Sequence, residues 1–321
     1  MSDTTNARHD GTNSIGPGSS TGLIGPIGLI GTGTMGAAMA TALLEAGRSL
    51  VVHDARADAA TALVDKGATW AATPAEVGEH CRVVLSSLPG PTEVEAVCRG
   101  ETGLFAGARA GDVHAGLSTV SVPFARQLAE WSTARCLHYL DAPVSGGAIG
   151  IQGKSLTVMA SGDPAALAAV RPVLEVFSGR IFDLGSDPGL GTLLKLVNNA
   201  IFLCSGLIHQ EAVVLATKAG VDPKQLDDVL AASSAQLYLA LAPLTLSRSW
   251  DNPFFSLALA EKDLALALDS ARSLAVPMPV TSAAHQHYLR GLAAGLGAKL
   301  CLSTLAVIES AAGVEVPARK S

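Results

Sequence analysis

The sequence predicts an α/β protein in which a parallel sheet covered by helices is followed by an all-helical domain. Apolar, strand-like runs alternate with helical segments up to about residue 187, and this alternation is typical of a parallel sheet with helices on both faces. From residue 188 onward the strand signals stop. The longest helical segment, 192–219, contains no proline and only one glycine, Gly206, so we expect one long helix to join the two domains. A chain of 321 residues is long enough for both.

Composition excludes several classes of function. The net charge of −6 comes without any cluster of Lys and Arg, so we expect neither a nucleic-acid nor an anionic-membrane partner. The five cysteines form no C-x-x-C pair and the eight histidines show no ligand-like spacing, which predicts a reducing cytoplasm and no metal site. No uninterrupted apolar run reaches the roughly 18 residues of a membrane span. Residues 1–22 are polar, lack the apolar core of a secretory signal, and are expected to be a disordered tail.

The first strand and helix enclose a glycine turn. In PIGLIGTGTMGAAMATALLEAG, residues 26–47, an apolar strand 27–30 is followed by Gly31, Gly33 and Gly36 and then by a helical segment. The G-x-G-x-x-G spacing lets the backbone approach a diphosphate at the helix N-terminus, where unpaired N–H groups and the helix dipole favour an anion. The turn therefore predicts a Rossmann-type dinucleotide-binding domain, which we place at residues 23–187.

The second strand, 49–53, ends at Asp54. An acid about 20 residues after the glycine turn is placed to accept hydrogen bonds from the adenosine ribose. A carboxylate there repels a 2′-phosphate, so Asp54 favours NAD over NADP, and Arg56 softens that preference. The alternative is that Asp54 caps the next helix, 57–66.

The remaining sheet elements follow from the same alternation. Two loops rich in proline and glycine end strands, Leu88-Pro89 and 141–147, and Ser118-Thr119 ends a third strand. In this architecture, ligands bind at the carboxyl edge of the sheet, where such loops lie. The expected strands are 68–71, 82–87, 112–117, 138–140, 155–161 and 180–184, and the expected helices are 73–80, 92–98, 123–132 and 164–177.

The second domain, 188–321, is expected to be all-helical. Prolines and glycines separate its helical segments. Its leucine- and alanine-rich helices carry more apolar residues than one core needs, which predicts a homodimer or homotetramer. After the joining helix, the expected helices are 223–232, 237–246, 257–274, 279–292 and 302–311.

Lys195 and Asn199 lie four residues apart in the joining helix and so project from one face. Leucines and a valine flank Lys195, and desolvation lowers the pKa of a lysine, which makes its amine usable for proton transfer. Asn199 offers a donor and an acceptor to a substrate oxygen. The alternative is a surface lysine beside an ordinary polar residue.

Two further groups of residues have both a functional and a structural interpretation. Ser145-Gly146-Gly147 offers a hydroxyl and unhindered N–H groups, which suit a carboxylate, but the same residues also make an ordinary tight turn. Lys262-Asp263 lies in the helix 257–274. From the sequence alone, a surface ion pair is favoured for it.

Taken together, these motifs resemble the β-hydroxyacid dehydrogenase family. The resemblance covers roughly 23–317 and rests on five motifs in order. They are the glycine turn 28–36 with Met35, the loop Leu88-Pro89, the loop Asp141-Ala-Pro-Val-Ser-Gly-Gly147, the helix Gly189-x-Gly191-x-x-x-Lys195-x-x-Asn198-Asn199, and Phe255-x-x-x-Leu259-x-x-Lys262-Asp263-Leu264.

The resemblance implies a hydride transfer between NAD(H), with NADP possible, and a small carboxylate-bearing β-hydroxyacid or its semialdehyde. It implies that Lys195 is the general acid/base, that Asn199 orients the reacting oxygen, and that Ser145, Gly146 and Gly147 hold the carboxylate. The residues implied to bind the cofactor are Gly31, Gly33, Thr34, Met35, Gly36, Asp54, Leu88, Pro89, Thr119 and Lys262.

Three positions depart from the family's pattern. Gly116 stands where the family usually has Asp, and Ala298 and Cys301 stand in a C-terminal segment that usually carries Gly and Asp, with one residue inserted. The first departure is expected to affect a strand end, and the second to make the far wall of the substrate pocket more apolar. Two other functions share this fold, namely an NADPH-dependent imine reductase, which typically lacks the catalytic lysine, and a non-catalytic dinucleotide-binding protein.

Overall fold

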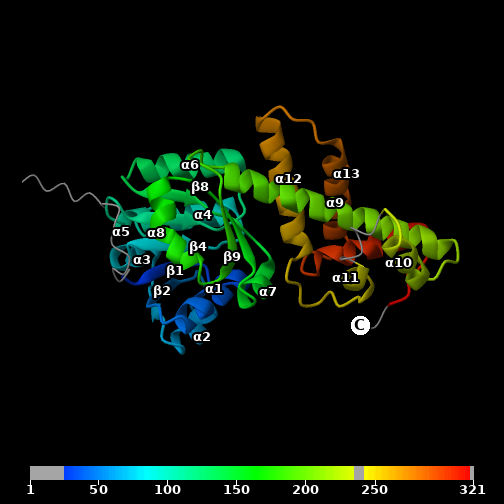
Figure 1. Ribbon diagram of the computed structural model, residues 1–321, viewed down its shortest axis with the longest axis horizontal. Helices are drawn as coiled ribbons and strands as arrows, with labels where there is room; N and C mark the ends of the chain where they lie inside the picture. The colour runs from blue at the N-terminus through cyan, green and yellow to red at the C-terminus, as the bar shows by residue number, and fades with distance from the viewer. Residues whose placement is uncertain (1–24, 235–241, 319–321) are drawn as a thin grey trace, which may run out of the picture.

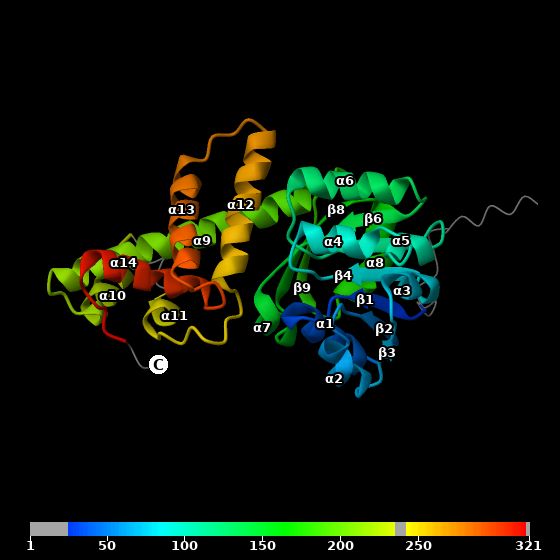
Figure 2. The ribbon, with the colours of Figure 1, turned by 180° about the vertical axis from the view of Figure 1, so that it is seen from behind.

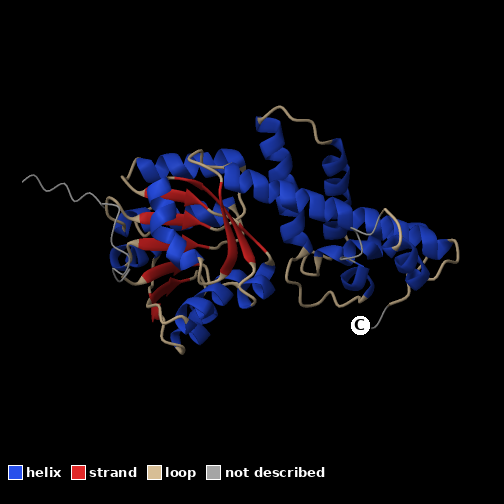
Figure 3. Ribbon diagram, in the orientation of Figure 1, coloured by secondary structure: helices blue, strands red, loops and turns tan. Residues whose placement is uncertain are grey.

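The computed structural model describes residues 25–234 and 242–318 (Figure 1). Residues 25–187 form the sheet domain and residues 188–318 the helical domain, and the described strands all lie in the first (Figure 3). This arrangement confirms the expected fold class. The expected tail 1–22 lies outside the described residues, as does the first part of the expected helix 237–246.

The sheet follows the strand order β3-β2-β1-β4-β5-β6 and continues through β8, which pairs with both β7 and β9. The pairs from β3 to β6 are all parallel. In this order β2 and β3 lie on one side of β1, and β4, β5 and β6 lie on the other. The strand order therefore reverses between β1 and β4, and open α/β sheets bind ligands beside the carboxyl ends of the strands at such a point. The strands are β1 (Ile27–Ile30), β2 (Leu50–His53), β3 (Thr69–Trp70), β4 (Val83–Ser86), β5 (Val113–Gly116), β6 (His138–Asp141), β7 (Val144–Ser145), β8 (Leu156–Gly162) and β9 (Ser178–Asp183).

The expectation of a wholly parallel sheet is wrong at one place. β8 runs antiparallel to both β6 and β7, and only β9 is parallel to β8. Between β6 and β8 the only helix is α7 (Gly147–Gln152). A helix of this length spans about 9 Å, which is too short to carry the chain back to the start of β6. β8 therefore begins beyond the end of β6 and runs in the opposite direction.

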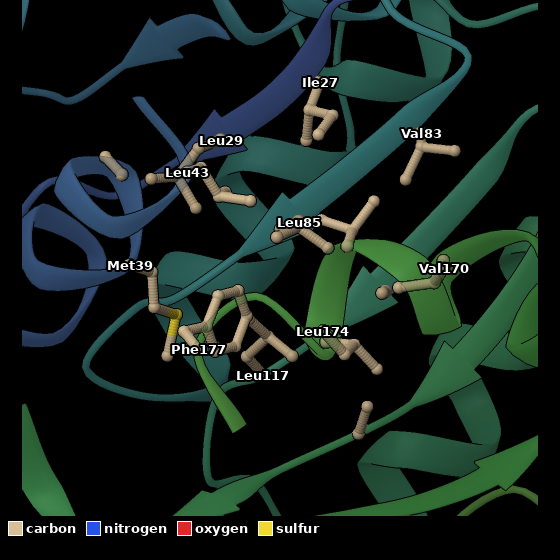
Figure 4. Close-up of a cluster of buried hydrophobic side chains, with 14 of the residues drawn as sticks. Ile27, Leu29, Met39, Leu43, Val83, Leu85, Leu117, Val170, Leu174 and Phe177 are labelled. Atoms are coloured by element: carbon tan, nitrogen blue, oxygen red, sulfur yellow. The ribbon is translucent and has the colours of Figure 1, made fainter. Parts of the chain in front are cut away.

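Helices cover both faces of the sheet, as expected. One face packs against α1, α2 and α8, and the buried side chains of this cluster include Met39, Leu85, Leu174 and Phe177 (Figure 4). The opposite face packs against α3 to α6 (Figure 2). The helices of this domain are α1 (Thr34–Glu45), η1 (Ala57–Ala60), α2 (Thr61–Val64), α3 (Pro74–His80), α4 (Pro91–Cys98), α5 (Leu104–Gly107), α6 (Val122–Thr133), α7 and α8 (Pro164–Leu174).

A single helix, α9 (Leu190–Lys218), leaves the sheet domain and crosses the helical domain (Figure 1). Its 29 residues correspond to about 44 Å. It has the length and hydropathy of a membrane span, a test that core helices of soluble proteins also pass, and 44% of its most apolar window is buried. It packs against β8 at one end and against α12, α13 and α14 along the helical domain.

The start of α9 is anchored by Asp141, the last residue of β6. Its buried carboxylate accepts hydrogen bonds from Thr192 N (2.8 Å), Thr192 Oγ1 (2.8 Å), Gly189 N (3.1 Å) and Ser161 Oγ (3.2 Å). Burial raises the pKa of Asp141 to about 6, although these hydrogen bonds oppose the rise. The group is therefore mainly ionised at pH 7, and β6 and α9 are held together by a charge that satisfies the helix N-terminus.

The remaining helices pack against α9 and form a second core with its buried residues. Leu203, Leu264 and Tyr288 are among the buried side chains of this core. The expected helices match to within a few residues, and the last begins as a 3₁₀ turn. The elements are α10 (Pro223–Ala231), α11 (Ala242–Leu246), α12 (Leu257–Ser273), α13 (Pro279–Ala293), η3 (Cys301–Thr304) and α14 (Leu305–Ala312).

Candidate active site

The glycine turn joins β1 to α1 as expected, and its three glycines serve different purposes. Gly31 has φ +94°, and a Cβ there would lie 2.3 Å from Ser87 O. A Cβ on Gly36 would lie 1.9 Å from Gly31 O, so Gly36 lets α1 pack closely on the turn. A Cβ on Gly33 would meet nothing within 4 Å. Gly33 therefore leaves the backbone at the start of α1 open, as the approach of a diphosphate requires.

Asp54 lies beside this turn. Its carboxylate accepts hydrogen bonds from Thr32 N (2.7 Å), Thr32 Oγ1 (3.1 Å) and Arg56 N (3.0 Å). Partial burial by itself would raise the pKa of Asp54, but the hydrogen bonds from Arg56 and Thr32 outweigh it, and the pKa lies below its ordinary value. Arg56, not Asp54, occupies the cap position of η1. The carboxylate is ionised at neutral pH and fixed at the end of β2.

A cavity of about 480 Å³ lies between the two domains at the carboxyl edge of the sheet. The glycine-turn residues Gly31, Gly33, Thr34 and Gly36 and the carboxylate of Asp54 lie outside its lining. The other residues singled out from the sequence all line it: Met35, Leu88, Pro89, Thr119, Ser145, Gly146, Gly147, Lys195, Asn199 and Lys262.

The loops on the sheet side of the cavity are connected to one another and to the helical domain. Ser118 Oγ accepts a hydrogen bond from Leu88 N (2.8 Å), which links the loops after β4 and β5. Lys262 reaches across from α12, and its Nζ donates to Thr119 O (3.1 Å). This hydrogen bond joins the helical domain to the loop after β5, in addition to the contacts of Asp141 with α9.

Lys262 and Asp263 are not the surface ion pair that the sequence alone favoured. Their Nζ and Oδ1 atoms are 2.8 Å apart, and the side chain of Asp263 is only 4% exposed. The other carboxylate oxygen of Asp263 accepts a hydrogen bond from Asn199 Nδ2 (2.5 Å). Asn198 continues the chain of contacts, donating to Asn199 Oδ1 (3.1 Å) and to Ser145 Oγ (3.4 Å). The loop Ser145–Gly147 and α12 are thus joined through two asparagines of α9.

Lys195 lies on α9 beside this network. Burial lowers the pKa of Lys195, the negative charge of Asp263 opposes that effect, and the positive charge of Lys262 lowers the pKa further. The acid nearest to Lys195 in the sequence, Asp187, is instead paired with Arg126 (3.1 Å). A lysine amine of lowered pKa beside an amide and a carboxylate can exchange a proton with a bound hydroxyl or carbonyl group.

Asp263, Asn198 and three phenylalanines of the cavity wall were not among the expected site residues. Asp263 directly follows Lys262, but neighbouring helix residues point about 100° apart, so the sequence did not indicate that both reach one cavity. Asp263, Asn198 and Phe255 belong to the motifs that resemble the family, and only this membership indicated from the sequence that they lie at the site.

The structure shows where the departures from the family's pattern lie. A Cβ on Gly116 would lie 2.8 Å from the hydroxyl of the buried Tyr139, so the tyrosine occupies the space that an aspartate there would need. Ala298 and Cys301 do not line the cavity, contrary to expectation. Cys301 is fully buried in the core of the helical domain.

Two protein families match the two domains. Residues 26–185 match the NAD binding domain of 6-phosphogluconate dehydrogenase, and residues 189–308 match the NAD-binding domain of NADP-dependent 3-hydroxyisobutyrate dehydrogenase. The second match covers the helical domain, which carries Lys195 and Lys262.

Curated relatives are similar over nearly their whole length. 2-(Hydroxymethyl)glutarate dehydrogenase of Eubacterium barkeri is 33% identical over 90% of this chain and 97% of its own. L-Threonate dehydrogenase of Cupriavidus necator is 33% identical over 91% and 98%. A probable mitochondrial 3-hydroxyisobutyrate dehydrogenase of Dictyostelium discoideum is 34% identical over 85% and 87%.

Solved structures of 3-hydroxyisobutyrate dehydrogenases have a similar fold over most of this chain. A 3-hydroxyisobutyrate dehydrogenase from Salmonella typhimurium has a TM-score of 0.78 and 27% identity, covering 88% of this chain and 99% of that one. One from Mycobacterium tuberculosis has a TM-score of 0.78 and 28% identity over 89% and 99%. An imine reductase from Streptomyces aurantiacus aligns less well, with a TM-score of 0.58 and 26% identity over 88% and 99%.

Proposed function

This chain belongs to the β-hydroxyacid dehydrogenase family and is an NAD(P)-dependent hydroxyacid dehydrogenase, and on that premise we propose its substrate and mechanism. It transfers a hydride between NAD(H) and a small carboxylate-bearing β-hydroxyacid or its semialdehyde, of the 3-hydroxyisobutyrate or tartronate semialdehyde type. The observation that carries this proposal is that Lys195 lines the same interdomain cavity as Ser145, Gly146 and Gly147. Residues 23–187 bind the dinucleotide, and residues 188–321 serve the substrate and self-association.

Lys195 is the general acid/base in this proposal. In oxidation, its neutral amine takes the proton of the substrate hydroxyl, and in reduction its ammonium group gives that proton back to the carbonyl oxygen. Asn199 orients the same oxygen, because its own amide is fixed by Asp263. Ser145, Gly146 and Gly147 hold the carboxylate through the hydroxyl and backbone N–H groups. Bound nicotinamide supplies the hydride acceptor or donor.

The residues present fit a dinucleotide. Gly33 leaves the backbone open at the start of α1, and Gly31, Thr34, Met35 and Gly36 complete that turn. Leu88, Pro89, Thr119 and Lys262 line the cavity from the sheet side and from α12. The ionised Asp54 supports NAD as the preferred form, because its charge opposes a 2′-phosphate, although the exposed Arg56 beside it keeps NADP possible.

A screen of 3-hydroxyacids with NAD⁺ and NADP⁺ in parallel tests this function. We expect turnover of carboxylate-bearing 3-hydroxyacids, with a higher kcat/KM for NAD⁺, and none of the matching methyl esters. Oxidation of esters and acids at equal rates would contradict the carboxylate site. A preference for NADP⁺ would contradict the role given to Asp54.

Two alternative functions are tested by the same screen. An imine reductase would reduce a cyclic imine faster than a semialdehyde acid, but Lys195, which such enzymes typically lack, argues against it. A non-catalytic dinucleotide-binding protein would bind NAD(H) tightly and turn over no acid, and the intact Lys195, Asn199 and Lys262 argue against it.

We also propose a cytoplasmic homodimer or homotetramer assembled through α9. An apolar stripe on this helix consists of Leu194, Val197, Ile201, Ile208 and Leu215, which are 43% to 73% exposed. Four of the five are spaced by seven residues, the repeat by which one helix packs along another. A second copy offers the same stripe by symmetry, so an isologous pair covers both.

Two charged substitutions test this assembly. Ile201→Asp with Ile208→Asp is expected to convert the oligomer to monomers in sedimentation velocity, whereas Val64→Asp, at a residue 41% exposed in the sheet domain, is expected to leave the mass unchanged. An unchanged oligomer in the double variant would contradict the interface. Binding of monomeric wild-type protein to phospholipid vesicles would assign the stripe to a membrane instead.

A further inference from the structure

We propose that the substrate carries a large apolar group, of aromatic or branched size, and that Phe202, Phe254 and Phe255 hold it. This inference rests on the proposed hydroxyacid chemistry of the same cavity and narrows its substrate class. Three of the seven phenylalanines in the chain line this one cavity, together with Leu259.

The aromatic residues lie on the helical side of the reacting groups. Phe202 follows Asn199 by three residues and Lys195 by seven on α9, so it lies on the same side of the helix, about 4.5 Å beyond Asn199 and about 10.5 Å beyond Lys195 along the axis. Phe254 and Phe255 come from the loop that precedes α12, and Leu259 from the first turn of that helix. A carboxylate held at Ser145–Gly147 on the sheet side therefore leaves the rest of the substrate to face this apolar wall.

The charged groups of the cavity leave no partner for a second acidic group. Its described lining contains two cations, and Lys262 is paired with Asp263 at 2.8 Å. The other cation, Lys195, is the group given to the reacting oxygen. A second carboxylate, such as that in the substrate named for the Eubacterium barkeri relative, would find no unpaired cation in this lining, and its burial against the phenylalanine rings would be unfavourable.

The backbone of the phenylalanine loop is held by the C-terminal segment that departs from the family's pattern. Cys301 N donates to Phe255 O (3.0 Å), Leu257 N donates to Lys299 O (2.8 Å), and Ala258 N donates to Gly297 O (3.0 Å). The segment 297–301 thus supports the loop that carries Phe254 and Phe255, although its own side chains lie outside the cavity lining.

The ring of Phe254 is partly exposed in the cavity, where a ligand can cover it. Phe254 lines the cavity and is 46% exposed. An exposed aromatic ring at an apolar wall gains free energy when another apolar group covers it. Phe254 is therefore the residue whose removal should most change the choice between apolar and small substrates.

A matched substrate series tests the inference. The acids are 3-hydroxypropanoate, 3-hydroxy-2-methylpropanoate, 2-benzyl-3-hydroxypropanoate and 2-(hydroxymethyl)glutarate, each with saturating NAD⁺. We expect kcat/KM for the benzyl acid to exceed that for 3-hydroxypropanoate and for the dicarboxylate by about tenfold or more. Phe254→Ala should lower the ratio of benzyl acid to 3-hydroxypropanoate by about tenfold, and Phe254→Leu by less.

The control is Phe182→Ala, at a β9 residue of the sheet domain that is 45% exposed. This variant removes the same ring at the same exposure away from the cavity, so the ratio should stay at its wild-type value. Circular dichroism checks that each variant folds. If Phe254→Ala does not fold, the substrate ratio is measured with Phe254→Leu instead.

The outcomes separate this inference from the proposed function. If 3-hydroxyacids are oxidised but 3-hydroxypropanoate or the dicarboxylate is preferred, the apolar site is overturned and the function stands. If no acid is oxidised but calorimetry shows that the benzyl acid binds, with affinity reduced about tenfold by Phe254→Ala, the function is overturned and the apolar site stands. Absence of both turnover and binding overturns both.

Discussion

The two domains contribute different kinds of groups to the shared cavity. The sheet domain contributes backbone, glycines, hydroxyl groups and aliphatic side chains, such as Gly147, Ser145 and Leu88. Every charged side chain of the described lining (Lys195, Lys262 and Asp263) and every aromatic one (Phe202, Phe254 and Phe255) comes from the helical domain. In the function we propose, the sheet domain therefore contributes mainly to binding, and the helical domain to proton transfer and choice of substrate.

The difference follows from the local geometry of the two domains. Parallel strands end in tight loops that expose backbone N–H groups at one edge, and glycines there let a ligand approach closely. Helices project long side chains from a rigid axis, which suits a lysine or a phenylalanine that must reach across a cavity. The following predictions test this division, in order of decreasing expected effect.

Removal of the proton-transfer group from the helical domain should abolish chemistry and leave cofactor binding in place. We expect Lys195→Ala to lower kcat by about 10³-fold, while the Kd for NADH, measured by fluorescence, stays within about twofold of wild type. Lys224→Ala, in an exposed ion pair of α10, is the control. Residual activity above about a tenth of wild type would remove Lys195 from the mechanism.

A substitution in the sheet domain should have the reverse effect. A Cβ on Gly33 meets no protein atom within 4 Å, so Gly33→Ala should fold normally and have an unchanged Tm without cofactor. The methyl group lies where the diphosphate would approach, and we expect Kd for NADH to rise about tenfold or more. Gly25→Ala, which is equally unobstructed at the start of the sheet, is the control. An unchanged Kd would mean that the diphosphate lies elsewhere.

Asp141 holds the two domains together, and its loss should appear as instability. In Asp141→Asn, the amide presents its own N–H groups to donors from Thr192, Gly189 and Ser161, at a cost of roughly 2–4 kcal/mol. We expect Tm from calorimetry to fall by roughly 5–10 °C. Asp183→Asn, at an exposed carboxylate that accepts one hydrogen bond from Gly185 N (3.0 Å), should change Tm little. Equal losses in both variants would contradict the anchoring role.

The smallest effect concerns the pH dependence of oxidation, for which Lys195 must be neutral. Activity should rise with pH as Lys195 loses its proton, and the lowered pKa places this rise below the ordinary range of a lysine. The charge of Asp263 raises the pKa of Lys195, so Asp263→Asn should move the rise to lower pH. The charge of Lys262 lowers it, so Lys262→Met should move the rise to higher pH. Profiles of kcat at saturating NAD⁺ check both directions, and shifts of the same sign would contradict the assignment of the titrating group.

Much of the fold was predictable because its determinants are local. The spacing of Gly31, Gly33 and Gly36 and the acid at Asp54 lie within one strand-turn-helix-strand unit, where the sequence specifies the geometry directly. Prolines and capping residues mark the starts of several helices, and Ser121 and Asp163 each accept a hydrogen bond from the first turn of the helix they cap. The direction of β8 was missed, because it depends on the short path between β6 and β8 and on no pattern within either strand.

The sequence by itself determined a dinucleotide-binding domain, a helical domain and the lysine at position 195 between them. The tertiary structure decided what surrounds that lysine. Asp263 meets Asn199 across 64 residues of chain, and Lys262 meets Thr119 across 143. The apolar wall combines a residue of α9 with a loop that the C-terminal segment holds. Local patterns fix which side of a helix a residue occupies, but the neighbour across a cavity is fixed only when α9 and α12 pack against each other and against the sheet edge.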